Sequence, residues 1–297
     1  MGYDFNMPMR EEAEAYFRSL QDRITDSLSA LEGQPFREDV WDREGGGGGR
    51  TRVIENGSVL EKGGVNFSRV FGKLPEEFAD QIPMGSGSEF FATGISLVIH
   101  PRNPMVPIVH ANFRYLEKGD AQWFGGGTDL TPCYPYPEDG THFHKTLKAA
   151  CDKHDESYYP RFKKWCDEYF TIRHRGEMRG IGGIFFDYLK DDPDGTFAFL
   201  RSAGDAFLPA YLPLIEKRRS EVYGAREREF QMLRRGRYAE FNLVYDRGTV
   251  FGLKTNGRVE SILMSLPPIA SWVYDYTPEP ASAEEKAAAY FQPRDWA

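Results

Sequence analysis

The sequence predicts an α+β fold built on an antiparallel sheet. Segments with strand character follow one another in groups, segments with helix character form other groups, and short turns connect neighbouring strands. A doubly wound α/β fold would instead alternate strands and helices along the chain. Neither an internal repeat nor a linker-like change of composition occurs, so we expect a single domain over residues 1–297.

The chain begins with a predicted amphipathic helix over residues 8–33. Pro8 suits the first turn of a helix, Gly33 suits its end, and apolar residues recur every three or four positions between them. Asn56-Gly57 is typical of a tight hairpin turn, which predicts a hairpin within residues 53–60. The glycine run at 45–50 cannot hold a fixed structure by itself. It is either a mobile insert or a lid that closes over a site.

The pattern of apolar residues assigns the rest of the chain. Strands are expected at 89–100, 107–116, 121–125 and 183–187, with two or three more within 237–265. A glycine-rich turn is expected at 125–132. Helices are expected at 138–152, 158–174, 195–219, 225–234 and 283–291.

The most informative segment is the expected strand 107–116, in which polar residues alternate with apolar ones. His110, Asn112 and Arg114 share one face of this strand, because successive side chains of a strand point to opposite faces. Ser96 and His100 alternate in the same way on the preceding strand. An imidazole, an amide and a guanidinium can hold an anion beside a proton-transfer group. The face is either the solvated side of an edge hairpin or a binding site, and two histidines with an arginine favour the site.

Two further groups of residues can carry chemistry. Asp129 lies in the expected glycine-rich turn, where it is either a base or hydrogen-bond acceptor for a ligand or a turn-forming aspartate bonded to its own backbone. Arg234 and Arg235, with Arg258 further on, form a basic group. Arginine forks bind carboxylates, which indicates a substrate with several carboxylates. The alternative for Arg234 and Arg235 is a solvated charge cluster at the end of a helix.

Composition and motifs exclude several classes of protein. The net charge of −8 disfavours non-specific binding to nucleic acid. No glycine-rich nucleotide motif, phosphate-binding loop or metalloprotease motif is present. The three cysteines show no metal-binding spacing, which suits reduced thiols in the cytoplasm. We expect no leader peptide and no transmembrane segment, because neither pattern occurs.

The chain resembles the oxygen-dependent coproporphyrinogen III oxidases over nearly its whole length. The resemblance is carried by long ordered blocks, including HPRNP, HANFR, WFGGGTDLTP and RRGRY, at residues 94–104, 110–114, 123–132, 164–170, 179–183 and 234–238. It implies a curved antiparallel sheet of about seven strands with helices on both faces. It also implies a homodimer formed through about Tyr238 to Val273.

The implied reaction converts two propionates of coproporphyrinogen III to vinyl groups, with O₂ as co-substrate, no organic cofactor and release of CO₂. In this interpretation Asp129 meets the pyrrole N–H protons, His110 is the proton donor and Arg114 holds a propionate. Further substrate-binding residues implied by the resemblance are Ser96, Asn112, Phe113, Asn256, Gly257 and Arg258.

The resemblance leaves a divalent metal open, because some members of the family have been described with one and others without. Its four histidine ligands match His100, His110, His144 and His174, although nothing in the linear spacing brings them together. Four imidazoles can bind Zn, Cu or Mn. Two other functions stay open: a metal-dependent oxygenase that uses these histidines, and a tetrapyrrole-binding carrier without catalysis.

Overall fold

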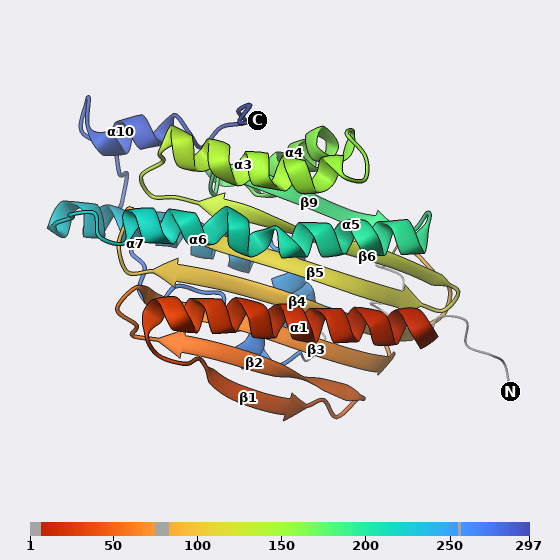
Figure 1. The fold of residues 1–297 in the computed structure, drawn as a ribbon. Coiled ribbons are helices and arrows are strands. Elements are labelled where there is room, and N and C mark those ends of the chain that lie inside the picture. Colours follow the sequence, from red (N-terminus) through yellow and green to blue (C-terminus); the bar gives the residue numbers. More distant parts are fainter. Residues whose placement is uncertain (1–6, 75–82, 255–256) are drawn as a thin grey trace, which may run out of the picture.

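A seven-stranded antiparallel sheet, in the order β1-β2-β3-β4-β5-β6-β9, organises the computed structural model (Figure 1). The structure describes residues 7–74, 83–254 and 257–297. The strands are β1 (Arg37–Asp42), β2 (Gly47–Glu55), β3 (Leu60–Lys73), β4 (Glu89–Pro101), β5 (Ile108–Lys118), β6 (Ala121–Thr131) and β9 (Gly182–Leu189). A small second sheet pairs β7 (Thr171–Ile172) with β8 (Glu177–Met178). The expected α+β fold with an antiparallel sheet is confirmed.

Helices lie on both faces of the sheet. One face carries α1 (Met7–Glu32), α3 (Pro137–Asp152), α5 (Pro193–Asp205) and α6 (Phe207–Arg218), while α4 (Tyr158–Tyr169) packs along β9 (Figure 1). The opposite face carries α7 (Ala225–Val244), α8 (Arg247–Lys254) and α9 (Val259–Leu263). The remaining helices are η1 (Arg173–Arg175) and α10 (Ala283–Ala288). None of the described helices combines the length and apolarity needed to cross a bilayer.

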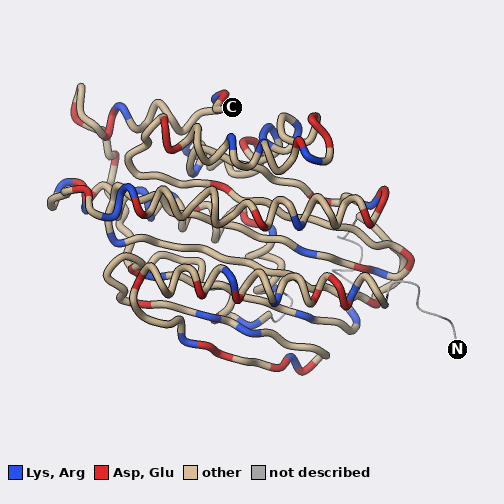
Figure 2. Tube along the Cα trace, viewed as in Figure 1, with Lys and Arg blue, Asp and Glu red and all other residues tan. Residues whose placement is uncertain are grey.

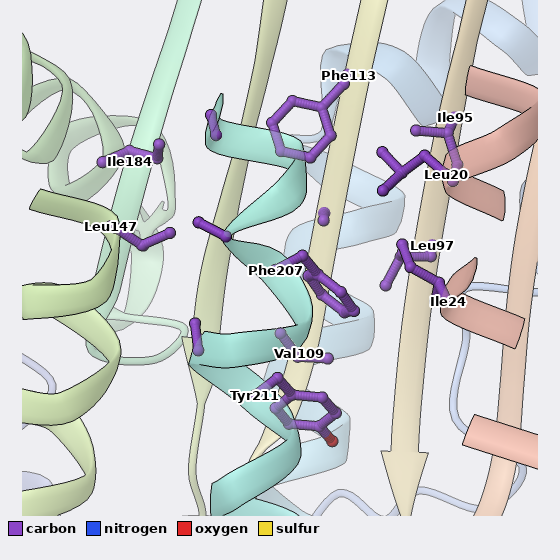
Figure 3. Packing of buried hydrophobic residues seen from close by; sticks show 14 of the residues in the cluster. Leu20, Ile24, Ile95, Leu97, Val109, Phe113, Leu147, Ile184, Phe207 and Tyr211 are labelled. Carbon is purple, nitrogen blue, oxygen red and sulfur yellow. The ribbon is translucent and has the colours of Figure 1, made fainter. Parts of the chain in front are cut away.

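The main core lies between the sheet and the layer of α1 and α6. Alternate residues of β4 and β5 point into it and meet leucine, isoleucine and aromatic side chains of these helices. Figure 3 shows this packing for Ile95, Leu97, Val109 and Phe113 of the sheet and Leu20, Ile24, Phe207 and Tyr211 of the helices. Because side chains alternate along a strand, the residues between these must face α7 to α9.

The register of β4, β5 and β6 brings the polar residues of this second face together. Ser96 pairs with Asn112 across β4 and β5, and His110 pairs with Asp129 across β5 and β6. Asp129 is therefore a strand residue, and the turn expected at 125–132 is wrong. Three glycines continue β6 without breaking it, since bulky neighbours fill the space that side chains would occupy.

The glycine run at 45–50 leads from the turn after β1 into the sheet. Gly46, in the turn between β1 and β2, and Gly47, the first residue of β2, adopt positive φ values of 115° and 84°. The next glycines belong to β2 and pair with both β1 and β3. Main-chain pairing on both sides supplies the order that the glycines lack by themselves. The hairpin turn expected at Asn56-Gly57 is confirmed between β2 and β3.

The strands expected at 237–265 are wrong, because α7 continues to Val244 and α8 and α9 follow. Short apolar runs do not distinguish a strand from a buried helix, and packing against the sheet decides between them. Two smaller corrections concern helix ends: the helix expected at 158–174 ends at Tyr169, and the one expected at 195–219 is divided at Ala206 into α5 and α6.

Acidic and basic residues are interspersed over the helices (Figure 2).

Candidate active site

A cavity of about 310 Å³ lies between the second face of the sheet and helices α7 to α9. Polar and apolar residues form its walls, from strands β3 to β5, from the region around α4 and β9, and from the C-terminal end of α7 onward. The sheet contributes Asn66, Ser68, Ser96, His110, Asn112 and Arg114, and the opposite wall contributes Asn242, Asp246, Arg247, Thr249, Ser261 and Ser265. A volume of this size is at the lower end for ligand sites.

His110 is held at the cavity by two hydrogen bonds. Its Nδ1 lies 2.8 Å from Oδ1 of Asp129, and its Nε2 lies 3.2 Å from Nδ2 of Asn112. An ionised Asp129 can only accept, so the proton of the neutral ring is on Nδ1. Nε2 then carries the lone pair and accepts from Asn112. This tautomer presents a proton acceptor to the cavity.

Asp129 lies behind His110 and is 1% exposed. It also accepts a forked pair of hydrogen bonds from Arg179, with Nε 3.0 Å from Oδ2 and Nη2 2.7 Å from Oδ1. Burial by itself raises the pKa of a carboxyl group. The charge of Arg179 and the bonds from His110 and Arg179 outweigh burial here, so the pKa of Asp129 is lowered and the group is ionised at neutral pH.

Arg114 lies on the same strand face, two residues beyond Asn112. Its Nη2 donates to Oδ2 of Asp187 on β9 at 2.5 Å. The pair can form because Gly125 lies between the two side chains: a Cβ at Gly125 would be 2.5 Å from Oδ1 of Asp187 and 2.9 Å from Nε of Arg114. The glycine in β6 therefore leaves room for the ion pair.

Two polar atoms beside the cavity have no hydrogen-bond partner among the described residues. They are Oδ1 of Asn112, an acceptor, and Nε of Arg114, a donor. Unpaired buried polar groups cost free energy, and a native protein rarely leaves them without a partner. Both atoms are closed off from solvent, so a ligand in the cavity reaches them only if the two side chains turn toward it.

The opposite wall adds a second acid and a second arginine. Asp246 accepts from the hydroxyl of Tyr169 at 2.9 Å and from the backbone N–H and hydroxyl of Thr249 at 2.9 Å and 2.7 Å. Burial raises its pKa, but the bonds from Thr249 outweigh burial and the pKa is lowered. The side chain of Arg247 is exposed at the cavity and stacks over Tyr169. Asp246 comes directly before α8 and Arg247 begins it, and the sequence analysis assigned no chemistry to either residue.

The structure brings together Ser96, His110, Asn112 and Arg114, as the alternation of the two strands predicts. His100 shares their face but is fully buried beneath α7, against Tyr238 and the Ser265 carbonyl. Phe113 is among the residues around the cavity, but its side chain lies in the core on the other face, so only its backbone faces the cavity.

Of the residues expected from the segment 256–258, the two that the structure describes do not line the cavity. Arg258 forms an ion pair with Asp39 of β1 and is not among the residues that line the cavity. Gly257 donates its N–H to the Gly252 carbonyl. Asn256 lies outside the described residues.

The four histidines of the expected metal site are separated in the fold. His144 bonds to Tyr159 and to the Ile181 carbonyl, and burial lowers its pKa to about 3. His174 bonds to Tyr245 and Glu240 near the surface. Among the described residues, no group of three or more histidine, cysteine or acidic side chains is arranged to hold a metal. These residues do not fit the expected ligand set.

The arginines of the 234–238 block are buried, so the solvated cluster is wrong for them. Arg234 is 4% exposed and pairs with Glu177, while Arg235 is fully buried and pairs with Glu61. Neither lines the cavity. Arg179, like Arg247, is an arginine of the site that sequence reasoning missed. The only sign of it was its place in one of the ordered blocks of the resemblance.

A family model described as coproporphyrinogen III oxidase matches residues 12–296 of the chain.

Proposed function

The chain belongs to the coproporphyrinogen III oxidase family, and we propose that it is the oxygen-dependent enzyme, which converts two propionates of coproporphyrinogen III to vinyl groups and yields protoporphyrinogen IX. Family membership makes it an oxidoreductase of porphyrin biosynthesis. Each step turns one propionic acid side chain and one O₂ into a vinyl group, CO₂ and H₂O₂. The two electrons that reduce O₂ come from the substrate, so the chemistry needs no organic cofactor.

The observation that carries the proposal is the pattern of donors and acceptors in the cavity. Arg114 and Arg247 offer guanidinium groups that suit propionates, and arginine forks bind carboxylates well. Asn112 lines the same cavity, and its carboxamide oxygen is an acceptor of the kind that a pyrrole N–H needs. A porphyrinogen has both kinds of group on one molecule, with the N–H donors inside the ring and the carboxylates outside it.

His110 is the group that we expect to exchange protons with the substrate. Its Nε2 accepts a proton in the tautomer that Asp129 favours, and the resulting imidazolium can return the proton later as the expected donor. Because Asp129 is 1% exposed, we propose that it acts through His110 and does not touch the pyrrole N–H groups itself.

The arrangement of the cysteines supports O₂ as the oxidant. A radical route through an iron–sulfur cluster needs several thiolates together. Cys133, Cys151 and Cys166 lie in three different core clusters, and burial raises the pKa of each thiol. All three are unpaired, which also supports a reducing compartment such as the cytoplasm.

We also propose that the chain forms the homodimer through the segment from Tyr238 to Val273. Several large apolar side chains of this segment have exposed fractions from 38% to 59%, and exposed apolar patches mark interaction sites. They are Leu243, Val244, Leu253, Val259, Ile269, Trp272 and Val273.

The test is an assay of purified protein with coproporphyrinogen III, under air and under argon, each with and without excess chelator. Chromatography of the oxidised porphyrins and an oxygen electrode measure product and O₂ uptake. Protoporphyrin formed only under air, with about two O₂ per product and no effect of chelator, supports the proposal.

Other outcomes support other functions. Product formed under argon would exclude O₂ as the obligatory oxidant. Loss of activity in chelator, restored by one added metal, would support the metal-dependent oxygenase. Substrate binding without product under any condition would support the carrier.

A further inference from the structure

We propose that Arg179 is a positioning residue, which orients Asp129 so that His110 presents an unprotonated Nε2 to the cavity. The inference rests on the proposed function, because it assigns the proton exchange to His110. Arg179 reaches the cavity wall, but only 2% of its side chain is exposed. It therefore acts on the reaction through Asp129 and not by holding substrate.

The guanidinium of Arg179 is fixed on every side. Its central carbon lies 4.0 Å from the ring centre of Phe170, 4.8 Å from that of Tyr238 and 4.9 Å from that of Phe241. Aromatic faces attract a guanidinium, and here they take the place of the water that would surround the group in solution. The remaining edge donates from Nη1 to Oδ1 of Asn242 at 3.0 Å. The plane of the guanidinium is thus set by four surrounding residues.

The fixed plane in turn sets the plane of the Asp129 carboxylate. A two-bond fork between Arg179 and Asp129 prevents rotation of the carboxylate, which a single hydrogen bond would allow. Oδ1 accepts from both Nη2 of Arg179 and Nδ1 of His110. The imidazole therefore keeps its proton on Nδ1, and Nε2, which accepts from Asn112, lies unprotonated at the cavity.

Other groups near Asp129 cannot replace Arg179. The carboxylate is surrounded by His110 of β5, the hydroxyl of Tyr238 on α7 and the thiol of Cys166 on α4. None of these carries a permanent positive charge. Lysine at position 179 would keep the charge but could form no fork.

Kinetics separate positioning from a purely structural role. Arg179→Gln should lower kcat by at least about 100-fold and leave KM within about threefold, because the propionate-binding arginines are unchanged. Arg179→Lys should recover part of kcat, and added guanidinium should partly restore the Gln variant. Arg235→Gln is the matched control: Arg235 is also a fully buried arginine in an ion pair, but it lies away from the cavity.

The control variant Arg235→Gln should have a lower free energy of unfolding, while its folded fraction keeps the kcat of the wild type. The double variant Arg179→Gln/Asp129→Asn should have a kcat little below that of Asp129→Asn alone, because both substitutions disrupt the same hydrogen-bonded arrangement of Arg179, Asp129 and His110. The proposal is overturned if the kcat of Arg179→Gln stays within twofold of the wild type, or if the substitution mainly changes KM. It is also overturned if the fold-decreases in kcat of the two single variants multiply in the double variant.

A spectroscopic measurement tests the inference without turnover. In protein labelled with ¹⁵N-histidine, the nitrogen shifts of His110 should show one tautomer in the wild type, protonated on Nδ1. Arg179→Gln should give a mixture, and Arg179→Lys should lie between them. One unchanged tautomer in Arg179→Gln would overturn the proposal. If wild-type protein forms no product but its tautomer depends on Arg179, the proposed function fails and the positioning stands.

Discussion

Gly125→Ala should damage substrate binding while leaving the proton-transfer group intact. The new Cβ would lie 2.5 Å from Oδ1 of Asp187 and 2.9 Å from Nε of Arg114. Ordinary contacts need about 3.5 Å, so the carboxylate must retreat by about 1 Å. A shift of that size breaks the bond between Arg114 and Asp187 and moves the guanidinium from its place at the cavity.

The expected increase in KM follows from the free energy of one charge-assisted hydrogen bond. Such bonds contribute about 1.5–3 kcal/mol, which corresponds to an increase in KM of about 10- to 150-fold if one contact to a propionate is lost. The expected kcat stays within about threefold, because His110 and Asp129 lie elsewhere on the strand pair.

Steady-state kinetics with varied coproporphyrinogen III measure both constants. The matched control is Gly63→Ala on β3, whose Cβ would crowd the flexible Ile99 side chain at 2.8 Å in the core. It should lower the unfolding temperature without changing KM. An unchanged KM in Gly125→Ala, or an equal change in both variants, would refute the role assigned to the Arg114–Asp187 pair.

Three other predictions concern the buried acid, acid stability and assembly. Asp129→Asn should lower kcat by about 10²–10⁴-fold with KM nearly unchanged, because an amide can donate to His110 and reverse its tautomer. The control is Asp139→Asn, which breaks a comparable buried fork with Arg218 and should lower only the stability of the protein. Near-normal turnover in Asp129→Asn would contradict the role assigned to Asp129. Burial raises the pKa of Glu240, but the hydrogen bonds from Arg175 and His174 outweigh burial and lower the pKa to about 2. Glu240 therefore stabilises the fold above pH 4.5, its usual pKa, and this contribution is lost as the pH falls toward 2. Glu240→Gln should flatten the fall in unfolding free energy over that range, measured in urea; slopes equal to those of the wild type would exclude this contribution. Leu243→Asp combined with Val244→Asp should turn a dimer into a monomer in sedimentation experiments, whereas a monomeric wild type would rule out the proposed interface.

Much of the candidate site was predictable because its strands obey a local rule. The period of two places Ser96, His110, Asn112 and Arg114 on one face, and a short loop makes β4 and β5 neighbours. The same rule shows that the Phe113 side chain belongs to the core, although the family resemblance suggested a role in binding.

Residues with chemistry outside these strands could not be assigned in this way. Asp246 directly precedes and Arg247 begins a helix that sequence patterns interpreted as strand, and Arg258 pairs with an edge strand more than 200 positions away in the chain. The four histidines are equally plausible ligands in sequence but lie in separate environments, because strand order and helix packing determine their positions.

The sequence by itself determined the fold class, the face that carries the site and, through its long ordered blocks, the family. Only the tertiary structure decided that Asp129 is a buried strand residue forked by Arg179, fifty positions further along the chain. The physical reason is the range of the interactions. Alternation along a strand is set by neighbouring residues, whereas the partner of a buried charge is chosen by which distant segments the packed layers bring into contact.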